Sequence, residues 1–222
     1  MGKLLDTKTI GKIKDIFAEM KEPVQILFFG SDGDCDYCDD TRQLLEEVTA
    51  IDHRIGLSVY DLTADAQVAK QFNIDKAPGI VIAGKDGDQV LDFGIQYSGI
   101  PSGHEFGTLI NDILLVSGRD SGLSPQVREY LKKLDKPLHM QVFVTPTCPY
   151  CPPAVLLAHR MAMENPGMVR AEGVEATEFP ELSNRFGVSG VPQTVINAGA
   201  GSLVGAAPEN QLFSEIRRAL AN

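Results

Sequence analysis

The sequence predicts an α/β protein made of two tandem copies of one unit, each with a mixed four-stranded sheet core flanked by helices. Two observations support this fold class. Strand-like and helix-like segments alternate along the chain, which is typical of parallel strands joined by right-handed crossovers. In addition, five landmarks of the first half recur about 114 positions later, as expected for an internal duplication. The recurring pairs are Pro23 and Pro137, Cys35 and Cys148, Phe72 and Phe186, Ile74 and Val188, and Pro78 and Pro192.

The first unit begins with an amphipathic segment, in which Ile10, Ile13 and Phe17 follow helical spacing. The mostly apolar run at 24–29 predicts a strand buried on both faces. The later turn signal at 85–88 predicts a hairpin that adds an antiparallel edge to the sheet. The expected helices are 9–20, a segment following Cys35, 66–72 and 104–116, and the expected strands are 24–29, 57–62, 79–83 and 90–93.

A linker at 117–123 separates the two units, so we predict domains at 1–117 and 118–222. Ser124 and Pro125 then supply an N-cap and a proline at the first helical position, opening a helix to Leu134. A strand is expected at 139–144, followed by a helix from Ala154. The repeat thus gives each domain its own Cys-x-x-Cys motif.

Composition excludes several classes of protein. The chain has 222 residues, a net charge of −10 and a pI near 4.8. This charge argues against binding to nucleic acid or to an anionic membrane surface. No apolar run approaches the length of a transmembrane helix, and residues 1–12 lack a hydrophobic signal core, so we expect a cytoplasmic protein.

The cysteines indicate redox chemistry. All four lie in two Cys-x-x-Cys pairs, Cys35/Cys38 and Cys148/Cys151, and each pair precedes a predicted helix. Cysteines at this spacing lie about 5–6 Å apart, within the range that a disulfide tolerates. The helix N-terminus favours the thiolate, which is the form that attacks disulfides. A structural zinc site is the alternative, but zinc ribbons place their two pairs much closer in sequence. We expect no metal.

Cys148-Pro-Tyr-Cys151 resembles the motif of dithiol glutaredoxins, and Val188-Ser-Gly-Val-Pro192 resembles the proline segment of the thioredoxin fold. The whole chain resembles the glutaredoxin-like protein disulfide oxidoreductases of thermophilic prokaryotes, which carry two tandem thioredoxin-like units. The resemblance implies that Pro192 lies beside Cys148 and Pro78 beside Cys35, each after a cis peptide bond. Together with the preceding Val191 and Ala77, these prolines are the expected substrate-positioning residues.

The implied activity is dithiol–disulfide exchange with protein substrates. Cys148 attacks a substrate disulfide, a mixed disulfide forms, and Cys151 resolves it; Cys35 and Cys38 do the same at the first site. The exchange needs no bound cofactor. The resemblance implies a thioredoxin-reductase-like flavoprotein as electron donor. A peroxiredoxin is a candidate client protein. The alternatives are a dedicated electron shuttle to a peroxidase, a glutathione-dependent glutaredoxin and a structural zinc-binding module.

The chain departs from the thioredoxin pattern at a proton-relay position. Thioredoxins carry a buried aspartate six positions before the first cysteine, whereas Val142 and about Leu27 stand here. Glu46, Glu47 and Glu175 are possible substitutes. We interpret all three as solvated carboxylates at helix or strand ends.

The two motifs have different neighbours. Five aspartates, Asp32, Asp34, Asp36, Asp39 and Asp40, surround Cys35 and Cys38, whereas Thr147, Pro149 and Tyr150 flank Cys148. Negative charge disfavours a thiolate, so the second site is predicted to be the more reactive. The acidic run lacks the glycine and glutamate of a calcium loop, so we expect no calcium there. His159 lies too far along the helix to pair with Cys148, and we expect a core or surface histidine.

Overall fold

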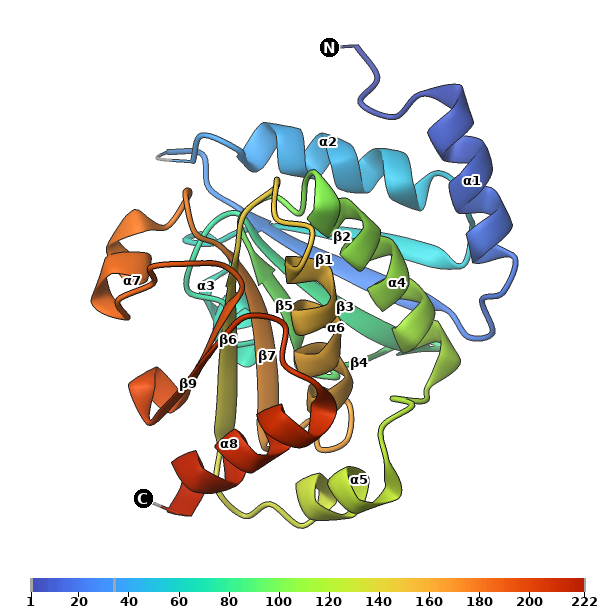
Figure 1. The fold of residues 1–222 in the computed structure, drawn as a ribbon. Coiled ribbons are helices and arrows are strands. Elements are labelled where there is room, and N and C mark those ends of the chain that lie inside the picture. Colours follow the sequence, from blue (N-terminus) through green and yellow to red (C-terminus); the bar gives the residue numbers. More distant parts are fainter. Residues whose placement is uncertain (1, 34, 222) are drawn as a thin grey trace.

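The computed structural model describes residues 2–33 and 35–221 (Figure 1). The first half contains α1 (Thr7–Phe17), β1 (Val24–Gly30), α2 (Cys38–Thr49), β2 (Ile55–Asp61), α3 (Ala66–Gln71), β3 (Gly79–Asp86), β4 (Gln89–Leu91), β5 (Ile95–Ser98) and α4 (His104–Gly118). The second half contains α5 (Pro125–Lys132), β6 (Leu138–Val144), α6 (Cys151–Ala162), β7 (Val169–Glu175), α7 (Pro180–Arg185), β8 (Gln193–Ile196), the 3₁₀ helix η1 (Asn197–Gly199), β9 (Gly201–Val204) and α8 (Glu209–Ala221).

The two halves repeat one strand topology. In the first, β1 pairs parallel with β2 and antiparallel with β3, and β3 pairs antiparallel with β5. In the second, β6 pairs in the same way with β7 and β8, and β8 pairs antiparallel with β9. The predicted α/β class, with a mixed sheet flanked by helices, is therefore confirmed. The division at 117/118 stays a prediction.

A single sheet runs through both halves, in the order β2-β1-β3-β5-β7-β6-β8-β9, with β4 paired to β3. The hairpin strand of the first half was expected at an edge. Instead it is interrupted at 92–94, and its second part, β5, pairs parallel with β7 of the second half. Gly94 has φ +71°, and a Cβ there would lie 2.4 Å from the Val169 carbonyl oxygen. The glycine thus permits both the interruption of the strand and the close approach of the two halves.

The strands alternate their side chains between two faces of the sheet. One face carries a continuous core beneath α1, α2, α4, α5, α6 and α8, to which Ile26 and Phe28 belong. On the other face, Leu27 and Phe29 belong to a small core beneath α3, and Phe143 belongs to a second small core beneath α7. These two small cores are separate. Polar strand residues lie between them, and this is where a cavity forms.

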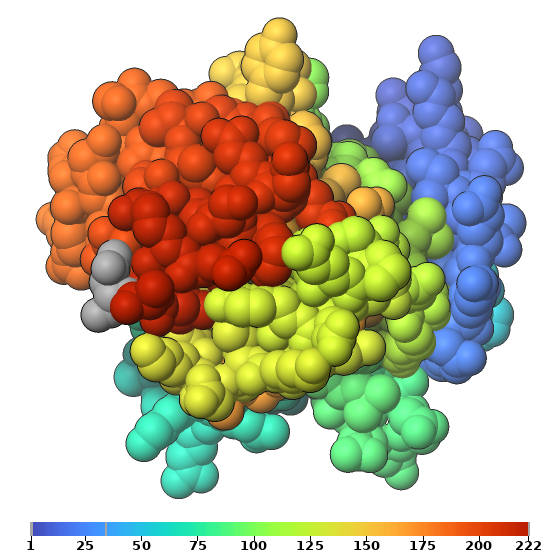
Figure 2. Space-filling view, turned by 60° about the horizontal axis from the view of Figure 1, so that its bottom comes forward, coloured from blue at the N-terminus to red at the C-terminus, as the bar shows by residue number. Residues whose placement is uncertain are grey.

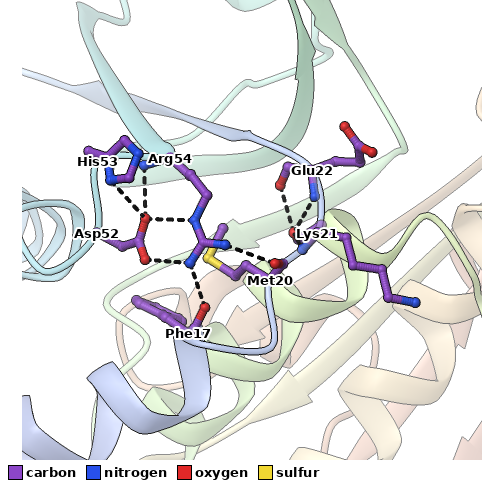
Figure 3. Close-up of polar contacts among 8 residues, drawn as sticks. Phe17, Met20, Lys21, Glu22, Asp52, His53 and Arg54 are labelled. Atoms are coloured by element: carbon purple, nitrogen blue, oxygen red, sulfur yellow. Dashed lines mark hydrogen bonds and ion pairs between the residues drawn. The ribbon is translucent and has the colours of Figure 1, made fainter.

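Side-chain hydrogen bonds fix the segment between α1 and β1 (Figure 3). Arg54 donates to the carbonyl oxygens of Met20 at 2.8 Å and Phe17 at 2.7 Å, and it also binds Asp52. Ser117, near the end of α4, accepts from the backbone N–H groups of Lys21 and Glu22. The first strand is thereby tied to the last helix of its own half.

Helix α5 and the C-terminal elements lie together on one face of the molecule, as Figure 2 shows. Tyr130 of α5 packs edge-on against Phe213 of α8, with ring centroids 5.1 Å apart. The packing of α5 on α8 therefore joins the first and last helices of the second half.

No helix in the described ranges 2–33 and 35–221 is both long and apolar enough to cross a membrane.

Two candidate dithiol sites

Both Cys-x-x-Cys pairs form disulfides with the same backbone geometry. The Cα atoms are 5.5 Å apart in Cys35–Cys38 and in Cys148–Cys151, as the spacing predicted. In each pair the second cysteine is the first residue of a helix, α2 or α6. The first cysteine lies just before that helix, so both sulfurs lie near its free N–H groups, where the helix dipole stabilises a thiolate.

Helix α6 begins three residues earlier than the sequence suggested, at Cys151 rather than Ala154. Pro152 and Pro153 follow in its first turn. The N–H groups of a first turn have no intrahelical acceptor, so prolines are tolerated there. The early start brings the helix N-terminus directly to the disulfide.

Both expected peptide bonds, Ala77–Pro78 and Val191–Pro192, are cis in the structure. Each proline stands directly before the strand that pairs antiparallel with the cysteine-bearing strand, namely β3 or β8. Ala77 and Pro78 line the same cavity as Cys35. The structure thus places the first proline and the first cysteine together.

The two sites differ in exposure. At the second site, Cys148 is 7% exposed and Cys151 is fully buried. At the first site, Cys38 is 8% exposed, but Cys35 is only half-buried and opens into a cavity of about 470 Å³. Thr177, Glu178, Phe179 and Pro180 of the second half form part of its lining. The first site is therefore built from both halves of the chain.

The acidic surround of the first site is only partly present at the cavity. Asp36 lines it, whereas Asp39 and Asp40 are exposed in the first turn of α2. Asp32 is also exposed, and Asp34 lies outside the described residues. In the part of the chain that the structure describes, no three histidine, cysteine or acidic side chains are grouped to hold a metal ion.

The strand position facing each dithiol is apolar in both halves. Phe28 pairs with Ile80 in β3, and Val142 pairs with Thr194 in β8, so Phe28 is the counterpart of Val142. The assignment of Leu27 was one residue off, because Leu27 points to the opposite face of the sheet. Neither half has a carboxylate at this position, and any proton acceptor must come from elsewhere.

The three carboxylates considered as substitutes have different environments. Glu46 pairs with Arg42 on the surface, as expected. Desolvation acts to raise the pKa of Glu47, but hydrogen bonds from the Gln43 side chain and from the backbone N–H groups of Leu4 and Leu5 lower it. The interpretation of Glu175 as solvated is wrong: the residue is 4% exposed and accepts from the Glu178 backbone N–H at 2.6 Å.

A cluster of buried ionisable groups lies where α4 and α6 pack together. His159, the histidine expected in the core or at the surface, is fully buried, and its Nδ1 lies 2.7 Å from Asp112. Tyr97 donates its hydroxyl hydrogen to the same carboxylate. Glu105 is 2% exposed, and neither of its carboxyl oxygens has a hydrogen-bond partner. Burial raises the pKa of Glu105 to about 7, and the nearby Thr108 hydroxyl and His159 oppose this only in part.

Sequence reasoning missed Glu105, although a signal was present. Glu105, Leu109, Asp112 and Val116 follow one helical stripe, so two acids occupy an otherwise apolar face. The helix begins against the loop before Cys148, since the His104 N–H donates to the Pro146 carbonyl oxygen at 2.9 Å. Charged residues on a core-facing stripe indicate a buried polar cluster.

A second buried carboxylate, Glu172, lies at the junction of β5 and β7. It is paired with Lys76 at 3.0 Å, accepts from Gln141 at 2.9 Å and from Ser98, and lies 3.4 Å from His139. Desolvation alone would raise its pKa. The neighbouring His139 imidazole and the Lys76 charge outweigh that effect, and the pKa of Glu172 lies well below its usual range. Glu172 therefore joins the two halves as an ionised group.

Comparison with known proteins identifies the family. Residues 138–218 match the family model described as a thioredoxin domain. A protein disulfide oxidoreductase from Aeropyrum pernix K1 is 30% identical, with a TM-score of 0.88 over 99% of this chain and 97% of that one. The chain belongs to the protein disulfide oxidoreductase family. It is thus a thiol–disulfide oxidoreductase with two Cys-x-x-Cys centres, as the resemblance implied.

This oxidoreductase also matches alkyl hydroperoxide reductases over part of their length. The NTD_N/C domain of alkyl hydroperoxide reductase AhpF from Enterococcus faecalis (V583) is 27% identical, with a TM-score of 0.84, over 96% of this chain and 99% of that one. The corresponding AhpF protein of Staphylococcus aureus (strain NCTC 8325 / PS 47) is 27% identical over 188 residues. That match covers 82% of this chain but only 33% of the relative. The chain therefore spans about a third of the length of such curated relatives.

Proposed function

We propose that the chain exchanges disulfides with protein substrates at both sites, with Cys148/Cys151 as the leading pair. The observation that carries this proposal is the placement of each disulfide at the start of a helix, with Cα atoms 5.5 Å apart. Such a pair can open and close with little movement of the backbone. We also propose the domain division 1–117 and 118–222, each domain carrying one site.

In the reducing direction, the Cys148 thiolate attacks one sulfur of a substrate disulfide. The Cys148–substrate bond forms as the substrate disulfide breaks, and the leaving sulfur takes up a proton. Cys151 then loses its proton and attacks Cys148, which releases the second substrate thiol. Two electrons pass from the dithiol to the substrate, and the oxidising direction is the reverse. Cys35 and Cys38 act in the same way at the first site.

The residues before β3 and β8 are the proposed substrate-positioning groups. Ala77 and Pro78 line the cavity at Cys35, where a bound substrate segment would lie. The duplication assigns the corresponding role at Cys148 to Val191 and Pro192. Proline offers no N–H of its own, so the backbone of the preceding residue is the group available to hydrogen-bond an extended substrate.

A second candidate function is electron delivery to a peroxidase, favoured by the matches to alkyl hydroperoxide reductase AhpF. In that role the electron donor would be a flavoprotein reductase and the client a peroxiredoxin. Both partners act through the same dithiols. The two candidates differ in the breadth of substrates that the chain accepts.

The test is insulin-disulfide reduction by wild-type protein and by variants in which one pair is replaced, C35S/C38S or C148S/C151S. A generic oxidoreductase reduces insulin, and the C148S/C151S variant is expected to lose most of that rate. A dedicated shuttle would reduce insulin poorly and a peroxiredoxin rapidly. Failure of the wild-type protein with both substrates would contradict the proposed function.

A further inference from the structure

A carboxyl group from the second half of the chain lies at the first dithiol site. Glu178 lies in the turn after β7 and lines the same cavity as Cys35, Asp36 and Pro78. Its Oε1 accepts the backbone N–H of Ile100 at 2.8 Å, which fixes the side chain on the wall facing the first half.

The backbone around Glu178 holds this placement. Gly99 has φ +93°, and a Cβ there would lie 2.9 Å from Glu178 Oε1 and 2.6 Å from Glu175 Cβ. A larger residue would thus displace the carboxyl group. The Glu178 backbone N–H donates to Glu175 at 2.6 Å. Both ends of the residue are therefore anchored, one to each half.

The charges around Glu178 favour its neutral form. Burial raises its pKa to about 7, Glu175 and Asp36 act in the same direction, and the Ile100 N–H opposes them. Glu178 also borders a second cavity, of about 590 Å³, between α7 and the segment 73–76 that follows α3. The charged and titratable groups of that cavity are Asp75, Lys76, His139, Arg170, Glu172, Glu181 and Arg185. Lys76, the cation next to Ala77, is already paired with Asp75 and Glu172.

We propose that Glu178 is the proton donor and acceptor of the first dithiol site, supplied across the junction by the second half of the chain. This inference rests on the proposed disulfide exchange. When the Cys35 thiolate attacks a substrate disulfide, the neutral Glu178 carboxyl gives its proton to the leaving sulfur. The resulting carboxylate then takes the proton of Cys38 as Cys38 attacks Cys35. Glu178 is thus regenerated, and the second substrate sulfur leaves as a thiolate that takes its proton from water.

The experiment isolates the first site in the C148S/C151S background and compares two disulfides with different leaving groups. Hydroxyethyl disulfide releases a basic alkyl thiolate, whose departure a proton donor assists, whereas 4,4′-dithiodipyridine releases a stabilised pyridinethiolate, which leaves without a proton on its sulfur. Oxidation of the reduced protein is followed from pH 5.5 to 8.5. The variant is Glu178→Gln, which keeps an acceptor for the Ile100 N–H, and Glu181→Gln, an exposed acid of the adjacent α7, is the matched control.

We expect E178Q to react about tenfold more slowly with hydroxyethyl disulfide at pH 6.5 and at an unchanged rate with dithiodipyridine. In the C148S/C151S parent, deprotonation of Glu178 should slow the reaction with hydroxyethyl disulfide above about pH 7. The E178Q variant should not show this decrease. E181Q should match the parent protein, as should E178Q in the C35S/C38S background. Equal slowing with both probes, or no slowing with either, would overturn the role of Glu178. Failure of both unsubstituted backgrounds to react would instead contradict the proposed function.

Discussion

The two dithiol sites have the same backbone geometry and different surroundings. Both place their Cα atoms 5.5 Å apart at a helix N-terminus. Cys148 and Cys151 are almost fully buried, whereas Cys35 opens into an acidic cavity with walls from both halves. The duplication has therefore preserved the local turn but not its electrostatic environment, because Asp36 within the first motif and Glu178 from the second half line the cavity there.

The comparison predicts a large difference between single cysteine variants. Cys148→Ser should lower insulin reduction by at least about tenfold, since the site with no carboxylate in its motif loses its nucleophile. Cys35→Ser should have a smaller effect. The measurement is the initial rate with dithiothreitol as reductant. If Cys35→Ser abolished the rate while Cys148→Ser preserved it, the order of the two sites would be reversed.

Glu172→Gln tests the junction that brings the second half to the first site. The depressed pKa of Glu172 means that its ionised form contributes its full stability above the usual carboxyl pKa, and that this contribution falls progressively as the pH drops from there towards the folded pKa. Removing the charge leaves Lys76 without its buried partner. The expected loss is about 3 kcal/mol of unfolding free energy at pH 7. Urea unfolding measures it, with Glu181→Gln as the exposed control.

Glu105→Gln tests the helix pair that supports the second site. The pKa of Glu105 is raised to about 7, so the folded protein binds a proton more tightly than the unfolded chain does. Stability should therefore fall as the pH rises from about 4.5 to about 7, by up to about 3 kcal/mol. The variant should lack this dependence. Urea unfolding at pH 5 and pH 8 compares the two proteins. The same change of unfolding free energy with pH in the variant as in the wild-type protein would refute the assignment.

The smallest expected effect concerns the acidic cavity wall. Asp36→Asn should increase the alkylation rate of reduced Cys35 about twofold at low salt, because one negative charge near the thiolate is removed. The increase should vanish in 1 M salt, where such charges are screened. Mass spectrometry after iodoacetamide treatment gives the rate for each cysteine, and Cys148 is the internal control. An increase that persisted in 1 M salt would exclude this cause.

Local signals predicted most of the fold and both cysteine pairs. Strand runs such as 24–29 and the repeated Pro78 and Pro192 depend on short-range sequence patterns, which the duplication doubles. The pairing of β5 with β7 could not be predicted in this way. It depends on an interruption of the strand at Gly94, and the local sequence there does not differ from that of an ordinary turn. Glu178 gave no signal either, since only the tertiary junction brings it to Cys35.

The pairing of β5 with β7 also has a consequence for solubility. Each half on its own would expose a further sheet edge, β5 in the first half and β7 in the second, and exposed edge strands recruit other chains into aggregates. In the intact molecule these two strands cover one another, and the ends of the sheet are β2 and β9. Joining the two halves in one polypeptide therefore protects each of them from self-association.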